Sequence, residues 1–195
     1  MCILVVDVLY KYVFENKKER EEGVVYVTDL CRCPLKSKLE QKYPNLVDPF
    51  KPVLLLGQIV HIGLEKLLQD YTEAELEVEK RVKLEKFTIA GRIDAIIDNT
   101  GVEIKYSASD AFIPYEHHIL QCKIYNWLFD LSKTILVYIT PERITEFNIG
   151  ERVNEIEVLK LIEDNKSPRF SWECNYCEFS RICPSKVKRH ESAKR

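Results

Sequence analysis

The sequence predicts an α/β fold, in which a mixed central sheet is flanked by helices and followed by a cysteine-rich C-terminal segment. Apolar residues recur at helical spacing on either side of the middle of the chain, in residues 54–70 and 116–131. Between these two stretches the chain is alternating or rich in β-branched residues, as in 87–97. Three cysteines, Cys174, Cys177 and Cys183, then gather near the C-terminus.

The N-terminal quarter is expected to be mainly helical. Residues 2–21 mix apolar residues with Lys and Glu and are followed by Gly23, which predicts a helix that ends there. Residues 24–27 suit a short strand. Thr28 is then expected to cap a second helix that carries Leu30, Leu35 and Leu39.

The remaining elements follow from the same periodicities. Asp98-Asn99-Thr100-Gly101 is a strong turn signal between two strands. In order, we expect a helix at 54–70, strands at 76–83, 87–97 and 102–106, a helix at 116–131, strands at 133–140 and 143–149, and a helix at 153–162.

Composition narrows the class of protein. With 195 residues and 46% hydrophobic residues, the chain suits one domain with a real core. We expect a single domain over 1–195, in which 1–50 are N-terminal helices, 51–165 a catalytic core and 166–195 a cysteine-rich tail. The longest apolar run without charge, 52–64, is shorter than the roughly 20 residues of a membrane span. The early run 3–9 contains Asp7, which argues against a secretory signal, so a cytoplasmic chain is expected.

The hairpin around Gly101 carries the candidate chemistry. A turn there sets Asp94 opposite residues 103–105, and Glu103 and Lys105 share a face because they are two apart. Two carboxylates and a backbone carbonyl suit a hard divalent ion, and a fixed ammonium beside it can stabilise a transition state of phosphodiester hydrolysis. The alternative is a set of solvated salt bridges, but the apolar neighbours indicate central strands, where such charges are costly.

Two helices supply further candidates. His61 lies on an apolar helix face beside Gly57 and can add an imidazole ligand, although a core histidine would look the same. Gln121 and Tyr125 are four apart, hence on one helix face, and can bond a phosphate or hold the lysine.

Seven cysteines are more than a chain of this size needs for its core, and their odd number excludes complete internal pairing. Cys174-x2-Cys177-x5-Cys183 with a remote fourth cysteine favours an iron-sulfur site over zinc, although His190 is a spare zinc ligand. Either metal would pin the tail to an early helix. We expect the remaining cysteines, Cys2, Cys31 and Cys122, to be ordinary thiols.

The combined pattern resembles a known family. Its parts are His61, Asp94, Glu103-x-Lys105, Gln121-x3-Tyr125, Cys33-Pro34 and Cys174-x2-Cys177-x5-Cys183-Pro184. The first four are similar to the RecB-type branch of the PD-(D/E)xK nucleases, which have a restriction-endonuclease-like core. The added cysteines resemble the CRISPR-associated RecB-like exonucleases, the Cas four family. The resemblance extends from about Tyr26 to Pro184.

The resemblance implies roles for these residues. Mn2+ or Mg2+ would be held by His61, Asp94, Glu103 and the Ile104 carbonyl, with Lys105 catalytic and Gln121 and Tyr125 supporting. A 4Fe-4S cluster would be held by Cys33, Cys174, Cys177 and Cys183; Cys33 is preferred to Cys31 because the family's ligand precedes a proline. Members cut DNA, often single strands from an end, and help to trim new spacers for the integrase complex.

Some features depart from the family or leave choices open. Leu35 stands after Pro34 where the family commonly has arginine, and the net charge of −2 leaves DNA contacts to local clusters. These clusters are Arg32, Lys36 and Lys38, and the tail residues Lys186, Lys188, Arg189, Lys194 and Arg195. Alternatives are a stand-alone or virus-encoded nuclease and a non-catalytic module that binds DNA ends or a partner. A homo-oligomer is also compatible with the sequence.

Overall fold

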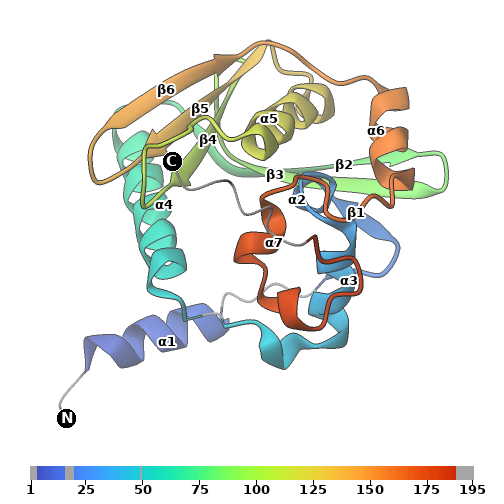
Figure 1. Cartoon of the computed structure of the whole chain (residues 1–195). Coiled ribbons are helices and arrows are strands. Elements are labelled where there is room, and N and C mark those ends of the chain that lie inside the picture. The colour runs from blue at the N-terminus through green and yellow to red at the C-terminus, as the bar shows by residue number, and fades with distance from the viewer. Residues whose placement is uncertain (1–3, 16–19, 49, 188–195) are drawn as a thin grey trace, which may run out of the picture.

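The computed structural model describes residues 4–15, 20–48 and 50–187 and confirms the α/β fold (Figure 1). The helices are α1 (Val5–Glu15), α2 (Val27–Leu30), α3 (Pro34–Lys42), η1 (Pro44–Leu46), α4 (Pro52–Tyr71), α5 (Glu116–Phe129), α6 (Glu155–Glu163), α7 (Glu173–Tyr176) and η2 (Glu178–Arg181). The strands are β1 (Val24–Tyr26), β2 (Glu75–Leu84), β3 (Phe87–Ile97), β4 (Thr100–Tyr106), β5 (Lys133–Ile139) and β6 (Ile144–Ile149).

The six strands form one mixed sheet in the order β1-β3-β4-β5-β6, and β2 pairs with β3. Strands β1 and β3 are parallel, as are β4 and β5, whereas the remaining pairs are antiparallel. The parallel β4–β5 pair needs a crossover, which α5 supplies. A mixed sheet between helices was the arrangement that the sequence predicted.

Strand β3 lies at the centre of the sheet, and two different strands share one of its edges. While β2 follows one edge, β1 pairs at Thr88–Ala90 on the other edge and β4 pairs there only from residue 95. Residues 91–94 therefore face a gap between two strands. A gap in a sheet exposes backbone polar groups, which side chains must satisfy.

The β3–β4 hairpin has a two-residue turn instead of the four-residue turn that the sequence suggested. Asp98 and Asn99 have φ angles of 45° and 59°, and Ile97 pairs with Thr100. Two consecutive positive φ angles define the turn that fits the twist of paired strands, and Asp and Asn tolerate this conformation. The predicted register is confirmed, because the turn still sets Asp94 opposite Glu103–Lys105.

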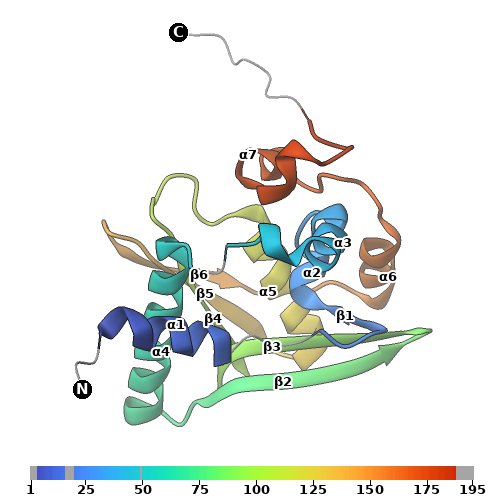
Figure 2. The same ribbon diagram turned by 90° about the horizontal axis from the view of Figure 1, so that it is seen from below.

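Helices cover both faces of the sheet (Figures 1 and 2). Against one face, Ile124 and Leu128 of α5 pack with Leu30 of α2 and with Ile89 of β3. Against the other face, apolar residues of α4 such as Val60 pack on β3 and β4. The side chains that face α5 and those that face α4 thus belong to separate cores on either side of one sheet.

The prediction that Thr28 caps one long second helix is wrong. Tyr26 is the residue before α2, Thr28 lies inside it, and the helix stops after Leu30. A new helix, α3, begins at Pro34 with Cys33 as its N-terminal cap residue. The residue before a proline is disfavoured in the helical conformation, so Cys33-Pro34 interrupts what the apolar spacing suggested was continuous.

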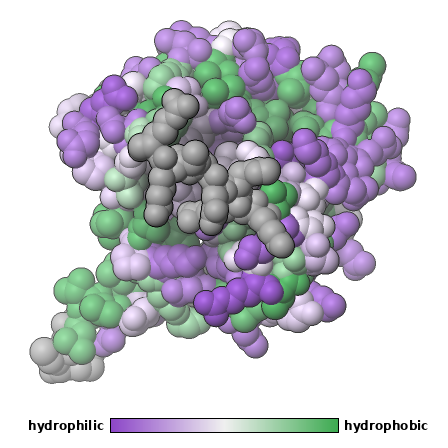
Figure 3. All heavy atoms as spheres, viewed as in Figure 1, coloured by the Kyte–Doolittle hydropathy of each residue, from purple (hydrophilic) through white to green (hydrophobic). Residues whose placement is uncertain are grey.

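The first helix is shorter than predicted. It ends at Glu15 among the described residues, and Arg20 and Glu21 are not helical. Cys2 lies outside the described residues. Several apolar side chains of α1 are exposed, including Val5 and Phe14, and α1 projects from the rest of the chain at the lower left of Figure 3. No helix in the described part of the chain is long and apolar enough to cross a membrane.

The C-terminal segment returns to the N-terminal helices through hydrogen bonds. The Cys33 N–H donates to Glu173 Oε1 at 2.6 Å, and the Leu35 N–H donates to Ser167 Oγ at 3.3 Å. Arg169 donates to the Arg32 carbonyl at 3.2 Å. These bonds join residues that are more than 130 positions apart in the sequence.

Candidate functional site

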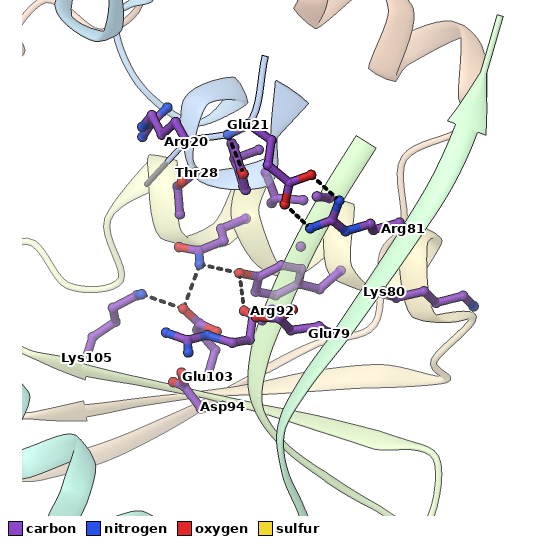
Figure 4. A pocket seen from close by; sticks show the side chains of 16 residues that line it. Arg20, Glu21, Thr28, Glu79, Lys80, Arg81, Arg92, Asp94, Glu103 and Lys105 are labelled. Carbon is purple, nitrogen blue, oxygen red and sulfur yellow. Dashed lines mark hydrogen bonds and ion pairs between the residues drawn. The ribbon is translucent and has the colours of Figure 1, made fainter. Parts of the chain in front are cut away.

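A cleft of about 660 Å³ opens over the gap in the edge of β3 (Figure 4). On one side lie residues of the segment that leads into β1 and α2, and on the other lies β2. Its lining residues are Arg20, Glu21, Tyr26, Val27, Thr28, Glu79, Lys80, Arg81, Ala90, Gly91, Arg92, Asp94, Glu103, Lys105, Gln121 and Tyr125. Five sequence-predicted site residues thus line one cleft: Asp94, Glu103, Lys105, Gln121 and Tyr125.

Asp94 sits where the alternation of β3 breaks. Ile93 packs in the core with α5, whereas Ala95 packs in the core with α4, although regular alternation would put both on one face. Glu77, which the β2–β3 register places opposite Asp94, has a φ of 50°. Such local irregularities redirect side chains next to functional sites. Asp94 Oδ2 then accepts a hydrogen bond from the Ile104 N–H at 2.6 Å, across the end of the gap.

Glu103 is only 2% exposed, and its two oxygens differ in environment. Oε1 accepts from Gln121 Nε2 at 2.7 Å and contacts the Lys105 ammonium. Oε2 is buried and has no hydrogen-bond partner in the described part of the chain. Burial, together with the nearby Asp94 carboxylate, raises the pKa of Glu103 to about 7.

Lys105 is held beside this carboxylate, as the predicted shared face requires. Burial opposes the charged form of Lys105, but the attraction of Glu103 and Asp94 outweighs burial and raises its pKa above the ordinary value. The side chain is therefore a protonated ammonium at neutral pH. It presents a fixed positive charge at the cleft.

Gln121 and Tyr125 form a hydrogen-bonded pair that binds Glu103 and not Lys105. One Gln121 amide contacts both Glu103 Oε1 and, at 3.0 Å, the Tyr125 hydroxyl. The Tyr125 hydroxyl donates to the Arg92 carbonyl at 2.7 Å, which satisfies a backbone oxygen in the gap of β3. The pair holds one carboxylate in a single orientation, so the suggested direct hold on the lysine is replaced by an indirect one through Glu103.

His61 of α4, the helix on the other face of the sheet, reaches Asp94. Its Nδ1 lies 3.5 Å from Asp94 Oδ2, and burial is outweighed by this partner, which raises the pKa of His61. The donor atoms of His61, Glu65 and Asp94 lie within 4.8 Å of one another. The structure therefore brings two predicted ligands, His61 and Asp94, together with a second carboxylate, Glu65.

Glu65 was missed by the sequence reasoning. It follows His61 by four residues in a predicted helix, and this spacing alone would have placed the two on one face. Burial and the neighbouring Glu77 carboxylate raise the pKa of Glu65 to about 7. Glu77 in turn pairs with Arg92. The acidic group around Asp94 is therefore larger than Asp94 and Glu103, although Glu65 and Glu77 do not themselves line the cleft.

These residues fit a hard divalent cation. Glu103 Oε2 is a buried acceptor to which no group in the described residues donates, and such an atom is costly unless a ligand completes its environment. Carboxylate oxygens and a neutral imidazole are donors that Mg2+ and Mn2+ accept. The predicted Ile104 carbonyl belongs to the residue whose N–H already binds Asp94.

Two of the three cations predicted on the N-terminal helices, Arg32 and Lys36, are engaged within the protein, whereas Lys38 is exposed. Arg32 pairs with Asp29 and Glu40 at 2.8 and 2.7 Å, and Lys36 pairs with Glu178 at 3.3 Å. Arg32 is therefore not the free DNA contact that the sequence suggested. The cations Arg20, Lys80, Arg81 and Arg92 line the cleft. Three of them are also paired with carboxylates: Arg20 with Asp29, Arg81 with Glu21 and Arg92 with Glu77. Five residues of the tail lie outside the described residues: the cations Lys188, Arg189, Lys194 and Arg195, and the spare zinc ligand His190.

The four predicted cluster ligands line a second, smaller pocket. It is formed by Cys33 at the start of α3 and by Cys174, Cys177 and Cys183 around α7 and η2. All four are free thiols, and burial raises the pKa of Cys177. Four thiols in one pocket fit a metal centre, since thiolates are soft ligands for zinc or iron-sulfur.

The other two described cysteines are buried in the core. Cys31 and Cys122 are almost fully buried, and burial raises the pKa of both thiols, as expected for inert cysteines. Neither of them lines the smaller pocket.

Known proteins resemble the chain in sequence and in structure. It is 45% identical over 183 residues to the CRISPR-associated exonuclease Cas4 of Saccharolobus solfataricus, which covers 86% of this chain and 91% of that protein. The crystal structure of SSO0001 superposes with a TM-score of 0.89 at 43% identity, covering 95% of this chain and 98% of that one. No protein-family profile matches.

A more distant likeness concerns the fold. The alkaline exonuclease LHK-Exo of Laribacter hongkongensis has a TM-score of 0.51 at 11% identity, with 72% of this chain and 83% of that chain covered. At this identity the likeness shows a shared fold and nothing beyond it.

Proposed function

Because the chain belongs to the family of CRISPR-associated Cas4 exonucleases, we propose that it is a metal-dependent deoxyribonuclease that cuts single-stranded DNA or DNA ends. One observation carries the proposal: the buried Oε2 of Glu103, which has no partner among the described residues, lies in a cleft with Asp94 and a protonated lysine. A complete set of this kind disfavours a non-catalytic module. A hard cation and a phosphodiester are ligands that such a cleft can bind.

The residues divide the work as follows. Asp94, Glu103, His61 and the Ile104 carbonyl would hold Mn2+ or Mg2+, and we add Glu65 on the basis of its place beside His61. The bound ion would polarise the phosphate and supply hydroxide near neutral pH. Lys105 offers its charge to the phosphoryl oxygens, and Gln121 and Tyr125 keep Glu103 Oε2 turned away from Lys105.

A cleavage assay tests this function. End-labelled single-stranded and duplex DNA are incubated with the protein in Mn2+, Mg2+ or EDTA. We expect cleavage with either ion, none in EDTA, and faster loss of label from the single strand. Cleavage that persists in EDTA would contradict the metal mechanism, and no cleavage with any ion would favour the non-catalytic module.

We further propose that Cys33, Cys174, Cys177 and Cys183 hold a 4Fe-4S cluster. Their shared pocket supports a metal centre, and three clustered cysteines with a remote fourth are less typical of zinc than two paired knuckles. Anaerobically purified protein should be brown and contain iron. Cys33→Ser should lose the colour, whereas the buried neighbour Cys31→Ser should keep it. Colourless protein with stoichiometric zinc would favour the rival site.

The cellular role that we propose is the trimming of new spacers for the CRISPR integrase complex, in the cytoplasm, by residues 1–195 acting as one nuclease domain. The hydrogen bonds between residues 33–35 and 167–173 support joint action of the N-terminal helices and the tail.

Exposed apolar residues on α1 support a protein contact, with the integrase or a second copy. Light scattering of the purified chain with and without integrase distinguishes these partners. Trimming of DNA ends that is unchanged by integrase would favour a stand-alone nuclease.

A further inference from the structure

We propose that Trp172, supported by Phe170 and His117, stacks an unpaired nucleobase next to the catalytic cleft, so that the cysteine-bearing segment forms part of the substrate site. The inference rests on the proposed function, because it specifies single-stranded DNA as the substrate of that site. The cluster ligands around Trp172 would then have a second effect besides joining the ends of the chain.

The three rings form a fixed aromatic surface. Phe170 and Trp172 are nearly parallel, with 16° between planes and 5.9 Å between ring centroids. His117 packs 4.8 Å from Trp172 and 6.1 Å from Phe170. Trp172 nevertheless keeps 37% of its surface exposed. One part of the indole is therefore held by its neighbours, while another part is open to a ligand.

This surface lies one helical turn from the catalytic network. His117 precedes Gln121 by four residues in α5, so the two share a helix face. Gln121 donates to Glu103 Oε1, as described above. Figure 2 shows the segment that carries α7 next to the start of α5. A base on Trp172 would thus be close to a phosphate in the cleft.

The chemistry of the surface suits an unpaired base. Stacking of a base on an aromatic side chain contributes about 1 to 3 kcal/mol and does not depend on sequence. Bases inside a duplex already stack on each other on both faces, so they cannot lie on the indole, whereas an unpaired base can. Burial, together with the Lys105 charge, lowers the pKa of His117 to about 4, so its ring is neutral and adds surface instead of charge.

The hydrogen bonds that bring the cysteines together also fix this surface. Glu173 stands between Trp172 and Cys174, and its carboxylate accepts from the Cys33 N–H at 2.6 Å and from the Phe170 N–H at 2.8 Å. The same carboxylate therefore sets the position of Phe170 and anchors the segment to α3. Loss of this anchor would displace the rings as well as the thiols.

Fluorescence of a single tryptophan tests the contact directly. The chain has two tryptophans, and Trp127→Phe leaves Trp172 as the only one. A short oligothymidylate is titrated in EDTA while tryptophan emission and the anisotropy of labelled DNA are both recorded. We expect DNA to quench the tryptophan emission, and the quenching curve and the anisotropy curve to have the same midpoint. Binding by anisotropy without quenching would overturn the inference but leave the nuclease proposal standing.

A matched pair of variants measures the contribution. Trp172→Leu should weaken binding of oligothymidylate by about 5-fold to 150-fold, the range that 1 to 3 kcal/mol gives. Tyr176→Leu removes another exposed ring of the same segment, 77% exposed and outside the three-ring surface, and should bind like wild type. Trp172→Phe should restore most of the affinity.

A DNA control separates stacking from folding. Wild type and Trp172→Leu should bind an oligonucleotide of abasic sites equally, because only the bases touch the indole. A loss of equal size on abasic DNA, or unchanged binding of oligothymidylate by Trp172→Leu, would contradict the inference. Failure of wild type to bind or cleave any DNA would instead contradict the proposed function.

Discussion

The two carboxylate oxygens of Glu103 have different environments, and this difference prepares the site for a cation. Lys105 and Gln121 bind one of its carboxylate oxygens and leave the other without a partner among the described residues. A buried carboxylate without compensation costs free energy, and a shared proton or a cation relieves that cost. Burial of a carboxylate with too few partners is thus the common reason for the raised pKa of Glu103 and for the unsatisfied Oε2 among the described residues.

Lys105→Ala should separate turnover from ion binding. The ammonium is assigned to the phosphate, so the variant should lose at least about 100-fold in kcat while it still binds Mn2+. Rapid-quench cleavage and calorimetric Mn2+ titration measure the two properties. The Mn2+ affinity should not fall, because removal of a positive charge does not weaken attraction of a cation. An abolished Mn2+ signal with a native circular dichroism spectrum would place Lys105 in the ion site instead.

At this scale the sequence predicted which residues line the cleft better than it predicted the hydrogen bonds between them. Strand alternation put Glu103 and Lys105 on one face, and the turn at Asp98–Asn99 set Asp94 opposite them, although the break in the alternation of β3 at Asp94 was not predicted. The sequence pattern could not show that Gln121 binds Glu103, since helix rotation and tilt depend on packing. The four-residue spacing between His61 and Glu65, the same spacing that relates Gln121 to Tyr125, was sufficient to predict that Glu65 shares a helix face with His61.

At the scale of elements, two glycines let the strands of the site pack closely. A Cβ on Gly91 of β3 would lie within 3 Å of Leu128 and Val27. A Cβ on Gly101 of β4 would meet Ile93 at 2.5 Å and Leu131 at 2.8 Å. Both positions face the core that α5 covers, so these glycines fix how near the helix stands to the strands.

Gly101→Ala should destabilise the protein by about 1 to 3 kcal/mol, because the added methyl overpacks buried side chains. Gly63→Ala is the control: it lies within α4 with nothing within 4 Å of its Cβ, and alanine should stabilise the helix by about 0.5 to 1 kcal/mol. Chemical denaturation of both variants measures the difference. Equal stability of the two variants would contradict the close packing at β4.

The prediction of elements succeeded where periodicity was long and failed where local chemistry interrupted it. The strands and α4 and α5 were found within a few residues of their ends. The second helix was predicted as continuous because Leu30, Leu35 and Leu39 keep a helical spacing. Proline at position 34 overrides that spacing through its clash with the preceding residue, and this places Cys33 at a helix end facing the tail.

The whole molecule is closed by contacts between its two ends. Glu178 of η2 accepts from Lys51, which precedes α4, and pairs with Lys36 of α3. Burial disfavours the carboxylate, but these two cations outweigh it and lower the pKa of Glu178 to about 2. The ion pairs therefore stabilise the closed chain as long as Glu178 is ionised.

Acid should weaken this closure. A carboxyl with a depressed folded-state pKa contributes its stability above its unfolded-state pKa of about 4.3, and that contribution is lost as pH falls toward 2. Glu178→Gln should lower the unfolding free energy at pH 7 by about 1 to 2 kcal/mol. The gap to wild type should close between pH 5 and about 2 in thermal melts. A constant gap over that range would show that ionisation of Glu178 does not matter.

Contacts at this largest scale were the hardest to predict. The resemblance implied that Cys33 meets the tail, yet nothing in the sequence indicated that Glu173 bonds the Cys33 N–H or that Arg169 bonds the Arg32 carbonyl. Such contacts join segments that are distant in sequence and depend on the completed fold. The same holds for Arg32, a candidate DNA contact by sequence, which its two carboxylate partners engage inside the protein.

The central claim is that Asp94 and Glu103 hold the ion that cleaves DNA, and Asp94→Ala tests it most directly. Single-turnover cleavage of labelled single-stranded DNA in Mn2+ is compared for wild type and variant, with circular dichroism to confirm the fold. We predict a loss of at least about 1,000-fold, since the ion loses a carboxylate ligand and Ile104 loses its acceptor. The fold should persist, because removal of Asp94 relieves its repulsion of Glu103. Cleavage at the wild-type rate by a folded Asp94→Ala protein would contradict the account.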